Sequence, residues 1–202
     1  MIDRDEMQVC GIVLAGGRSS RFGADKLAAM VEGRPLLEAA IAGVAAVASD
    51  IIVVIAPGDE RVLPGGPSVR VIVDPESFGG PLVGLLAGLE ATAQPLVVVA
   101  GGDMPSLSAA VLGLMLRSMT TADDAFGAVI LERLGRRQPL PAVVRTGSAI
   151  ELARQLVANG ERSLRSLFER LPTRTLEEGE WRPLDPDGAT LRDIDRPSDL
   201  DS

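Results

Sequence analysis

Four short apolar runs, each followed by a turn that contains glycine or aspartate, limit most strongly the folds open to this chain. The runs cover residues 9–14, 51–55, 69–73 and 96–100. Segments in which apolar residues recur at helical spacing lie between or after them, at residues 36–48, 78–89 and 108–118. Buried strands that alternate with helices are typical of a mostly parallel, doubly wound sheet with helices on both faces, so the sequence predicts an α/β fold.

The length and composition fit a single domain, which we expect to span residues 1–202. Apolar residues make up 46 % of the chain and aromatic residues only 2 %, so we expect an aliphatic core, as in buried parallel sheets. Cys10 lies inside a predicted strand and is expected to be a small buried hydrophobe, and Trp181 a packing anchor. Further strands and helices are expected at residues 125–131, 148–158, 163–170 and 174–176.

Charge and missing residue types exclude several classes of function. A net charge of −8 without a long basic run argues against nucleic acid as a partner. The absence of histidine excludes Ser-His-Asp and Cys-His catalysis and the usual zinc sites. A charged N-terminal segment and the lack of about 18 consecutive apolar residues predict a cytoplasmic protein with no membrane partner. Because the chain has no histidine, any metal ion is expected to be Mg²⁺ held by carboxylates.

The turn after the first run combines glycine with basic residues. Gly16 and Gly17 lack Cβ atoms and so let backbone N–H groups approach an anion closely. Residues 18–26 carry a formal charge of +2 from three basic residues and one acidic residue: Arg18, Arg21, Lys26 and Asp25. Neither the Walker pattern nor Gly-x-Gly-x-x-Gly is present, so we interpret residues 14–26 as a phosphate-binding loop of another kind.

Two aspartates also follow predicted strands directly. Asp74 follows the third run, and Asp103 follows the fourth run after two glycines. In open α/β sheets, ligands bind beyond the carboxyl ends of the strands, so we expect both aspartates to converge with Gly16 and Gly17 on one edge. Asp103 is a candidate Mg²⁺ ligand, and the alternative is a turn or helix-capping aspartate.

Four stretches of the chain resemble those of a known family. Residues 14–26 resemble the signature Leu-Ala-Gly-Gly-x-x-x-Arg-Met-Gly-x-Asp-Lys of the nucleotidyltransferase superfamily, with Phe22 in place of methionine. Residues 138–144 and 159–165 resemble segments of its molybdenum cofactor guanylyltransferase branch. Residues 191–200 resemble the closing motif Asp-Ile-Asp-Thr-Pro-Glu-Asp-Leu of several relatives.

The resemblance implies roles for individual residues. It implies catalytic roles for Arg21, Lys26 and Asp103, and metal binding by Asp103 and Asp195, with Asp193 as the alternative to Asp195. The implied nucleotide-binding residues are Leu14, Ala15, Gly16, Gly17, Arg18, Lys26, Asp74 and Asp103. It further implies that residues 9–105 form a nucleotide-binding half and residues 106–202 an acceptor-binding half, with Mg²⁺ as the cofactor.

The resemblance also implies a reaction, the transfer of GMP from GTP to molybdopterin or the molybdenum cofactor with release of pyrophosphate. Other cofactor-biosynthesis proteins or molybdoenzymes are the implied protein partners. Ala56 stands where the guanylyltransferases carry asparagine, and Asp193 and Asp195 replace their asparagines. These departures keep two alternatives open: a cytidylyl- or other nucleotidyltransferase, and a non-catalytic protein that binds nucleotide or molybdenum cofactor.

Overall fold

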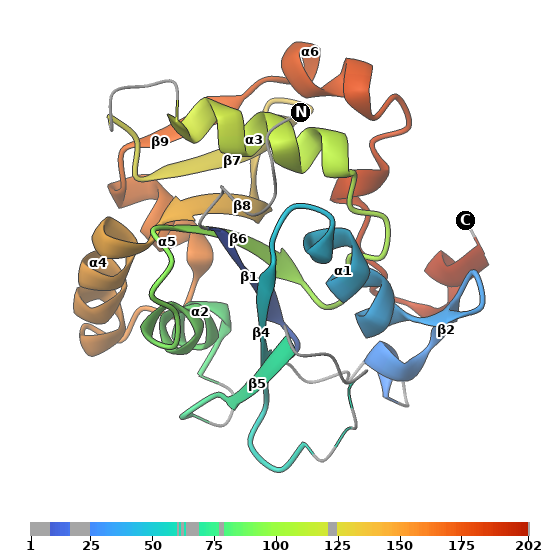
Figure 1. The fold of residues 1–202 in the computed structure, drawn as a ribbon, viewed down its shortest axis with the longest axis horizontal. Coiled ribbons are helices and arrows are strands. Elements are labelled where there is room, and N and C mark those ends of the chain that lie inside the picture. Colours follow the sequence, from blue (N-terminus) through green and yellow to red (C-terminus); the bar gives the residue numbers. More distant parts are fainter. Residues whose placement is uncertain are drawn as a thin grey trace.

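A seven-stranded sheet forms the centre of the protein (Figure 1). The computed structural model describes residues 9–16, 25–59, 61, 63, 69–76, 79–120 and 125–201. The strand order is β5-β4-β1-β6-β8-β7-β9. The strands are β1 (Val9–Leu14), β4 (Asp50–Ile55), β5 (Val69–Val73), β6 (Leu96–Gly101), β7 (Ala128–Arg133), β8 (Arg136–Arg145) and β9 (Thr173–Leu176). A separate two-stranded sheet consists of β2 (Met30–Val31) and β3 (Arg34–Pro35).

Most neighbouring strands of the large sheet are parallel. The pairs β1–β4, β1–β6, β4–β5 and β7–β9 are parallel, whereas β8 runs antiparallel to both β6 and β7. The predicted α/β fold with a mostly parallel sheet is therefore confirmed. The antiparallel strand β8 was not among the expected strands, because the turn that reverses the chain is Leu134-Gly135 and not a typical Asn-Gly pair. Both turn residues have positive φ, 52° and 70°, as a tight hairpin requires.

Helices cover both faces of the sheet, and each face has its own apolar cluster. On one face, α1 (Leu36–Ala45) and α3 (Ala109–Thr120) pack against side chains such as Val13 and Val98. On the other, α2 (Pro81–Glu90), α4 (Thr146–Ala158) and α5 (Leu164–Arg170) pack against side chains such as Ile12 and Val99 (Figure 1). The core is aliphatic, as the composition predicts.

Short elements complete the chain around residues 177–201. They are α6 (Glu178–Trp181) and the 3₁₀ turns η2 (Arg182–Leu184), η3 (Ala189–Leu191) and η4 (Pro197–Asp201). Trp181 is fully buried, which confirms its predicted role as a packing anchor. Cys10 is also fully buried, and burial raises the pKa of its thiol.

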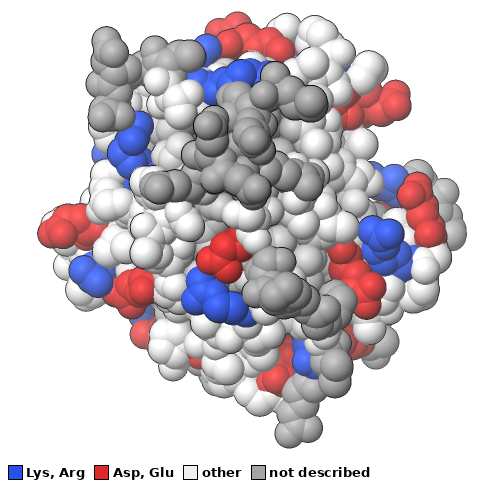
Figure 2. Space-filling view, in the orientation of Figure 1, with Lys and Arg blue, Asp and Glu red and all other residues white. Residues whose placement is uncertain are grey.

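The surface carries charges of both signs. In the space-filling view of Figure 2, basic and acidic side chains lie in small separate groups among uncharged atoms. Within the part of the chain that the structure describes, no helix has the length and apolar character needed to cross a bilayer.

Candidate active site

The carboxyl ends of β1, β4 and β6 meet at one edge of the sheet because these three strands are parallel. Backbone hydrogen bonds hold the start of the predicted phosphate loop there. The amide of Ala15 donates to the carbonyl of Val54 at 2.8 Å, and the carbonyl of Leu14 accepts from the amide of Gly102 at 2.9 Å. Leu14, Ala15 and Gly16 therefore lie between the ends of β4 and β6, at the edge of the sheet that the sequence predicts.

Asp74 lies at the same edge. Its amide donates to the carbonyl of Ile55 at 2.8 Å, and its Oδ1 accepts from the amide of Glu76 at 3.0 Å. The residue is only 8 % exposed, and burial raises the pKa of its carboxyl. A Cβ placed on Gly84 of α2 would lie 3.5 Å from Asp74 Oδ2, an ordinary contact distance, so α2 packs close to the carboxylate.

Asp103 occupies the turn that follows β6. A Cβ at Gly101 would overlap Oδ1 of Asp103, so the glycine before the turn makes room for the carboxylate. The helix-capping alternative is wrong, because the hydroxyl of Ser108 accepts the hydrogen bond from the first turn of α3, from the amide of Val111 at 3.4 Å. The carboxylate of Asp103 is one-third exposed and faces Lys26 instead.

The closing segment brings a second carboxylate to Asp103. The amide of Ile194, a fully buried residue, donates to the carbonyl of Asp103 at 3.0 Å. Oδ2 of Asp199 accepts from the amides of Asp195 and Arg196, at 3.0 and 2.8 Å. The hydrogen bond from Arg196 contributes most to the lowered pKa of Asp199. These bonds fix the turn that presents Asp195.

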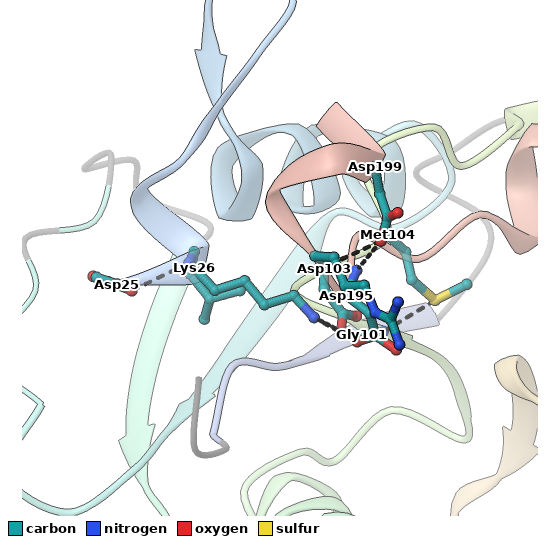
Figure 3. A network of polar contacts seen from close by, with 9 residues as sticks. Asp25, Lys26, Gly101, Asp103, Met104, Asp195 and Asp199 are labelled. Atoms are coloured by element: carbon teal, nitrogen blue, oxygen red, sulfur yellow. Dashed lines mark hydrogen bonds and ion pairs between the residues drawn. The ribbon is translucent and has the colours of Figure 1, made fainter. Parts of the chain in front are cut away.

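Lys26 joins the two carboxylates (Figure 3). Its Nζ lies 2.9 Å from Oδ2 of Asp103 and 2.9 Å from Oδ1 of Asp195. The lysine begins η1 (Lys26–Ala28), which Asp25 caps by accepting from the amide of Leu27 at 3.1 Å. Burial acts to lower the pKa of Lys26, but the hydrogen bonds to Asp195 and Asp103 outweigh burial and leave the pKa raised.

Asp195 is the carboxylate of the closing motif that reaches this lysine, which favours it over Asp193 as a metal ligand. Asp193 lies close by, and its pKa is raised, first by partial burial and then by the charge of Asp195.

The donor set at this point fits a metal ion that arrives with phosphate ligands of its own. Among the described residues, no group of three or more histidine, cysteine, aspartate or glutamate side chains could enclose a metal ion. Asp103 and Asp195 each place one oxygen 2.9 Å from the same ammonium, so these two oxygens are separated by at most twice that distance. Mg²⁺ typically takes one or two carboxylates and completes its shell with water and substrate phosphates.

Three predicted site residues, Gly17, Arg18 and Arg21, lie outside the described residues, so their roles remain predictions. The pairing of Lys26 with both carboxylates was not predicted. It joins positions separated by 77 and 169 residues, and no local pattern in the sequence signals it.

A cavity of about 390 Å³ lies between the β7–β8 hairpin and α5. This volume falls within the range of small-molecule sites, roughly 300–1,000 Å³. One part of its wall is apolar, with Ile130, Pro139 and Phe168, and the charged part consists of Arg136, Arg137, Arg165 and Glu169. Arg137 also donates to the carbonyl of Phe168 at 3.2 Å, which links the hairpin to the helix. Pro139 and Arg165 belong to the two stretches that resemble the guanylyltransferase branch, residues 138–144 and 159–165, whereas the other residues of the lining lie outside them.

Comparisons with known proteins show which family this chain resembles. Residues 11–175 match the MobA-like NTP transferase domain. The chain is 34 % identical over 197 residues to a probable molybdenum cofactor guanylyltransferase of Chloroflexus aggregans, covering 96 % of this chain and 92 % of the relative. It is 36 % identical over 177 residues to a molybdenum cofactor guanylyltransferase of Burkholderia vietnamiensis, covering 84 % and 85 %.

Solved structures share the fold. Molybdopterin-guanine dinucleotide biosynthesis protein A of Archaeoglobus fulgidus aligns with a TM-score of 0.76 at 24 % identity, over 95 % of each chain. The 4-diphosphocytidyl-2C-methyl-D-erythritol synthase of Anaerococcus prevotii aligns with a TM-score of 0.71 at 16 % identity, over 97 % of this chain and 94 % of that one. The same fold therefore occurs in proteins that are named for different activities.

Proposed function

Because this chain belongs to the MobA-like NTP transferase family, we propose that it transfers GMP from GTP to molybdopterin or the molybdenum cofactor and releases pyrophosphate. The observation that carries the proposal is the convergence of Asp103, Asp195 and Lys26 beside the start of the glycine loop. Relatives of similar length that are 34 % and 36 % identical bear the name of this activity.

Each residue of the site has its own role in binding the metal ion or the nucleotide. Asp103 and Asp195 would hold Mg²⁺, which when bound offsets the negative charge that develops on the phosphates. Lys26 supplies a charge-assisted hydrogen bond to a phosphate oxygen. The backbone of Ala15 and Gly16 approaches the nucleotide, and Asp74 holds the nucleoside. Gly17, Arg18 and Arg21 complete the loop in this proposal.

The proposed chemistry needs no protein base. A phosphate oxygen of the acceptor attacks the α-phosphorus of GTP, and the bond from that phosphorus to the oxygen of pyrophosphate breaks. A phosphate monoester is largely ionised near pH 7, since its second pKa is about 6. The chain's contribution is therefore positioning and charge stabilisation, which supply most of the catalysis in phosphoryl transfer. The absence of histidine is consistent with this mechanism.

We propose that the cavity beside α5 receives the acceptor, within the half formed by residues 106–202. Its apolar wall suits a flat ring, and its arginines suit anionic groups. The turn between β7 and β8 lies at the same edge of the sheet as the carboxyl end of β6, because β8 is antiparallel to both β6 and β7. The carbonyl of Arg162, just before α5, also accepts from the amide of Leu82 at 3.1 Å near the start of α2.

Arg165→Ala is expected to raise KM for the acceptor by roughly tenfold, the effect of losing one hydrogen bond to a charged group. KM for GTP should change little, because none of the described residues of the loop lines the cavity. Arg170→Ala on the same helix is the matched control, since Arg170 is exposed and does not line the cavity. Steady-state kinetics with each substrate varied separately measures both constants. An equal loss in both variants would argue against this acceptor site.

Ala56 bears on the base preference of the proposed nucleotide site. Ala56 follows β4, and a Cβ on Gly16 would lie 3.7 Å from the amide nitrogen of Ala56. An alanine at this place offers a base only its backbone groups. The backbone must then provide the selectivity for guanine that the family's asparagine otherwise supports.

A thermal-shift panel of GTP, CTP, ATP and UTP with Mg²⁺ tests the proposed nucleotide. GTP at 100 times its Kd should stabilise the folded protein by about 2.7 kcal/mol, and the other nucleotides by less. A preference for CTP would favour a cytidylyltransferase. No shift with any nucleotide would favour a non-catalytic protein. A following turnover assay, with pyrophosphate release as the readout, tests the acceptor.

A further inference from the structure

Lys26 holds a position that a metal ion would also need. Its ammonium donates to Asp103 and Asp195 at 2.9 Å, and its side chain is only 12 % exposed. A metal ion shared by the same two oxygens would lie in the region that Nζ fills, because Mg²⁺ binds oxygen at about 2.0–2.1 Å. Two cations this close repel each other strongly. The lysine and the metal ion therefore exclude each other from the point between the carboxylates.

The charges at this point favour the lysine when no phosphate is present. Two carboxylates and one ammonium leave a formal charge of −1, and the ammonium already satisfies one oxygen of each carboxylate. A metal ion alone must break both ion pairs and leave a partly buried ammonium without a counter-charge, which is costly. A metal ion that arrives with a nucleoside triphosphate brings phosphate oxygens that the ammonium can bind instead.

The position of Lys26 in the chain suits such a transfer. It is the last residue of the loop, residues 14–26, that the sequence predicts to bind phosphate, and its long side chain has four methylene groups. Its backbone is fixed at the start of η1, so only the side chain has to move.

We propose that Lys26 competes with the divalent cation for Asp103 and Asp195, and that the nucleotide's phosphates draw it away, so that metal and nucleotide bind cooperatively. By linkage, the factor by which the nucleotide tightens metal binding equals the factor by which the metal tightens nucleotide binding. Lys26 thereby disfavours metal loading in the absence of nucleotide. The inference rests on the proposed function for the metal site at Asp103 and Asp195 and for the identity of the nucleotide.

Mn²⁺ binding to the nucleotide-free protein, followed by electron paramagnetic resonance, tests the competition without substrate or turnover. Lys26→Met keeps the length of the side chain and removes its charge, so its Kd for Mn²⁺ should fall by roughly tenfold relative to the wild type. Lys26→Arg keeps the charge and should retain the weak affinity of the wild type. An unchanged or weaker Mn²⁺ affinity in Lys26→Met would overturn the proposal.

A second variant locates the metal ion. Adding Asp103→Asn to Lys26→Met should abolish the gain in Mn²⁺ affinity, because the gained site uses that carboxylate. If the gain persists, the metal binds elsewhere and the proposal fails. Because these measurements contain no nucleotide, their outcome is independent of whether GTP or another triphosphate is the substrate.

The movement itself can be observed in the unaltered protein. Lys26 is the only lysine among the 202 residues, so protein labelled with ¹³C-lysine gives a single Cε resonance. Mg²⁺ at moderate concentration should leave this resonance in place, and Mg²⁺ with the unreactive α,β-methylene analogue of the triphosphate should shift it. A resonance that does not respond to the metal–nucleotide complex, under conditions where binding is seen by thermal shift, would contradict the transfer of Lys26 to phosphate.

Discussion

Asp103→Asn is expected to lower kcat by about 10³-fold while the protein remains folded. The variant removes one of two carboxylates that would hold Mg²⁺ and weakens the charge stabilisation of the leaving pyrophosphate, a loss of about 4 kcal/mol in the transition state. The side chain is one-third exposed at the edge of the sheet and does not belong to the apolar core, so the free energy of unfolding should change little. Pyrophosphate release at saturating GTP and acceptor measures kcat.

Asp187→Asn is the matched control for this substitution. Asp187 is exposed in the turn between η2 and η3, and its substitution changes the net charge by the same amount. Its kcat should equal that of the wild type. Wild-type turnover in Asp103→Asn, with Mg²⁺ present, would rule out the proposed role of Asp103.

Trp181→Ala is expected to lower the free energy of unfolding by about 3–5 kcal/mol, the usual cost of truncating a buried aromatic side chain. The ring is fully buried in the apolar cluster on the α3 side of the sheet. Its Nε1 donates to the carbonyl of Glu132 at 3.0 Å, and the guanidinium of Arg182 lies 5.3 Å from the ring centre. Truncation therefore leaves a cavity and an unpaired carbonyl near the end of β7. Urea denaturation followed by circular dichroism measures the change.

Two further substitutions separate packing from the hydrogen bond. Trp181→Phe retains most of the buried ring but loses the hydrogen bond, so its cost should be smaller than that of Trp181→Ala. Leu184→Ala, at a side chain that is 42 % exposed, should change stability by no more than about 0.5 kcal/mol. A loss below 1 kcal/mol in Trp181→Ala would mean that this part of the chain does not stabilise the sheet.

The sequence predicts the sheet well where each strand carries its own signal. The runs that become β1, β4 and β6 are apolar and buried because helices cover both faces of the sheet there, whereas β5 lies at the sheet edge, contains Arg70 and is largely exposed. Residues that follow parallel strands must meet at one edge, so the neighbourhood of Leu14, Asp74 and Asp103 could be predicted without coordinates. The burial of Trp181 likewise follows from residue type.

Other features depend on which parts of the chain meet. The strand β8 follows a Leu-Gly turn and includes a short proline-containing stretch. Its direction is fixed by its pairing with β6 and β7. Where α3 begins also depends on the fold: the helix starts at Ala109 after the capping residue Ser108, so Asp103 lies in the preceding turn and contacts Lys26.

By itself, the sequence determined the fold class, the edge of the sheet that carries the site and the residue types available there, because strand periodicity and turn chemistry are local properties. Only the tertiary structure decided that Lys26 lies between Asp103 and Asp195, and that arginines from the β7–β8 hairpin and α5 line one cavity. These arrangements join residues far apart in the chain. They are set by the packing of the whole sheet, which no short stretch of sequence encodes.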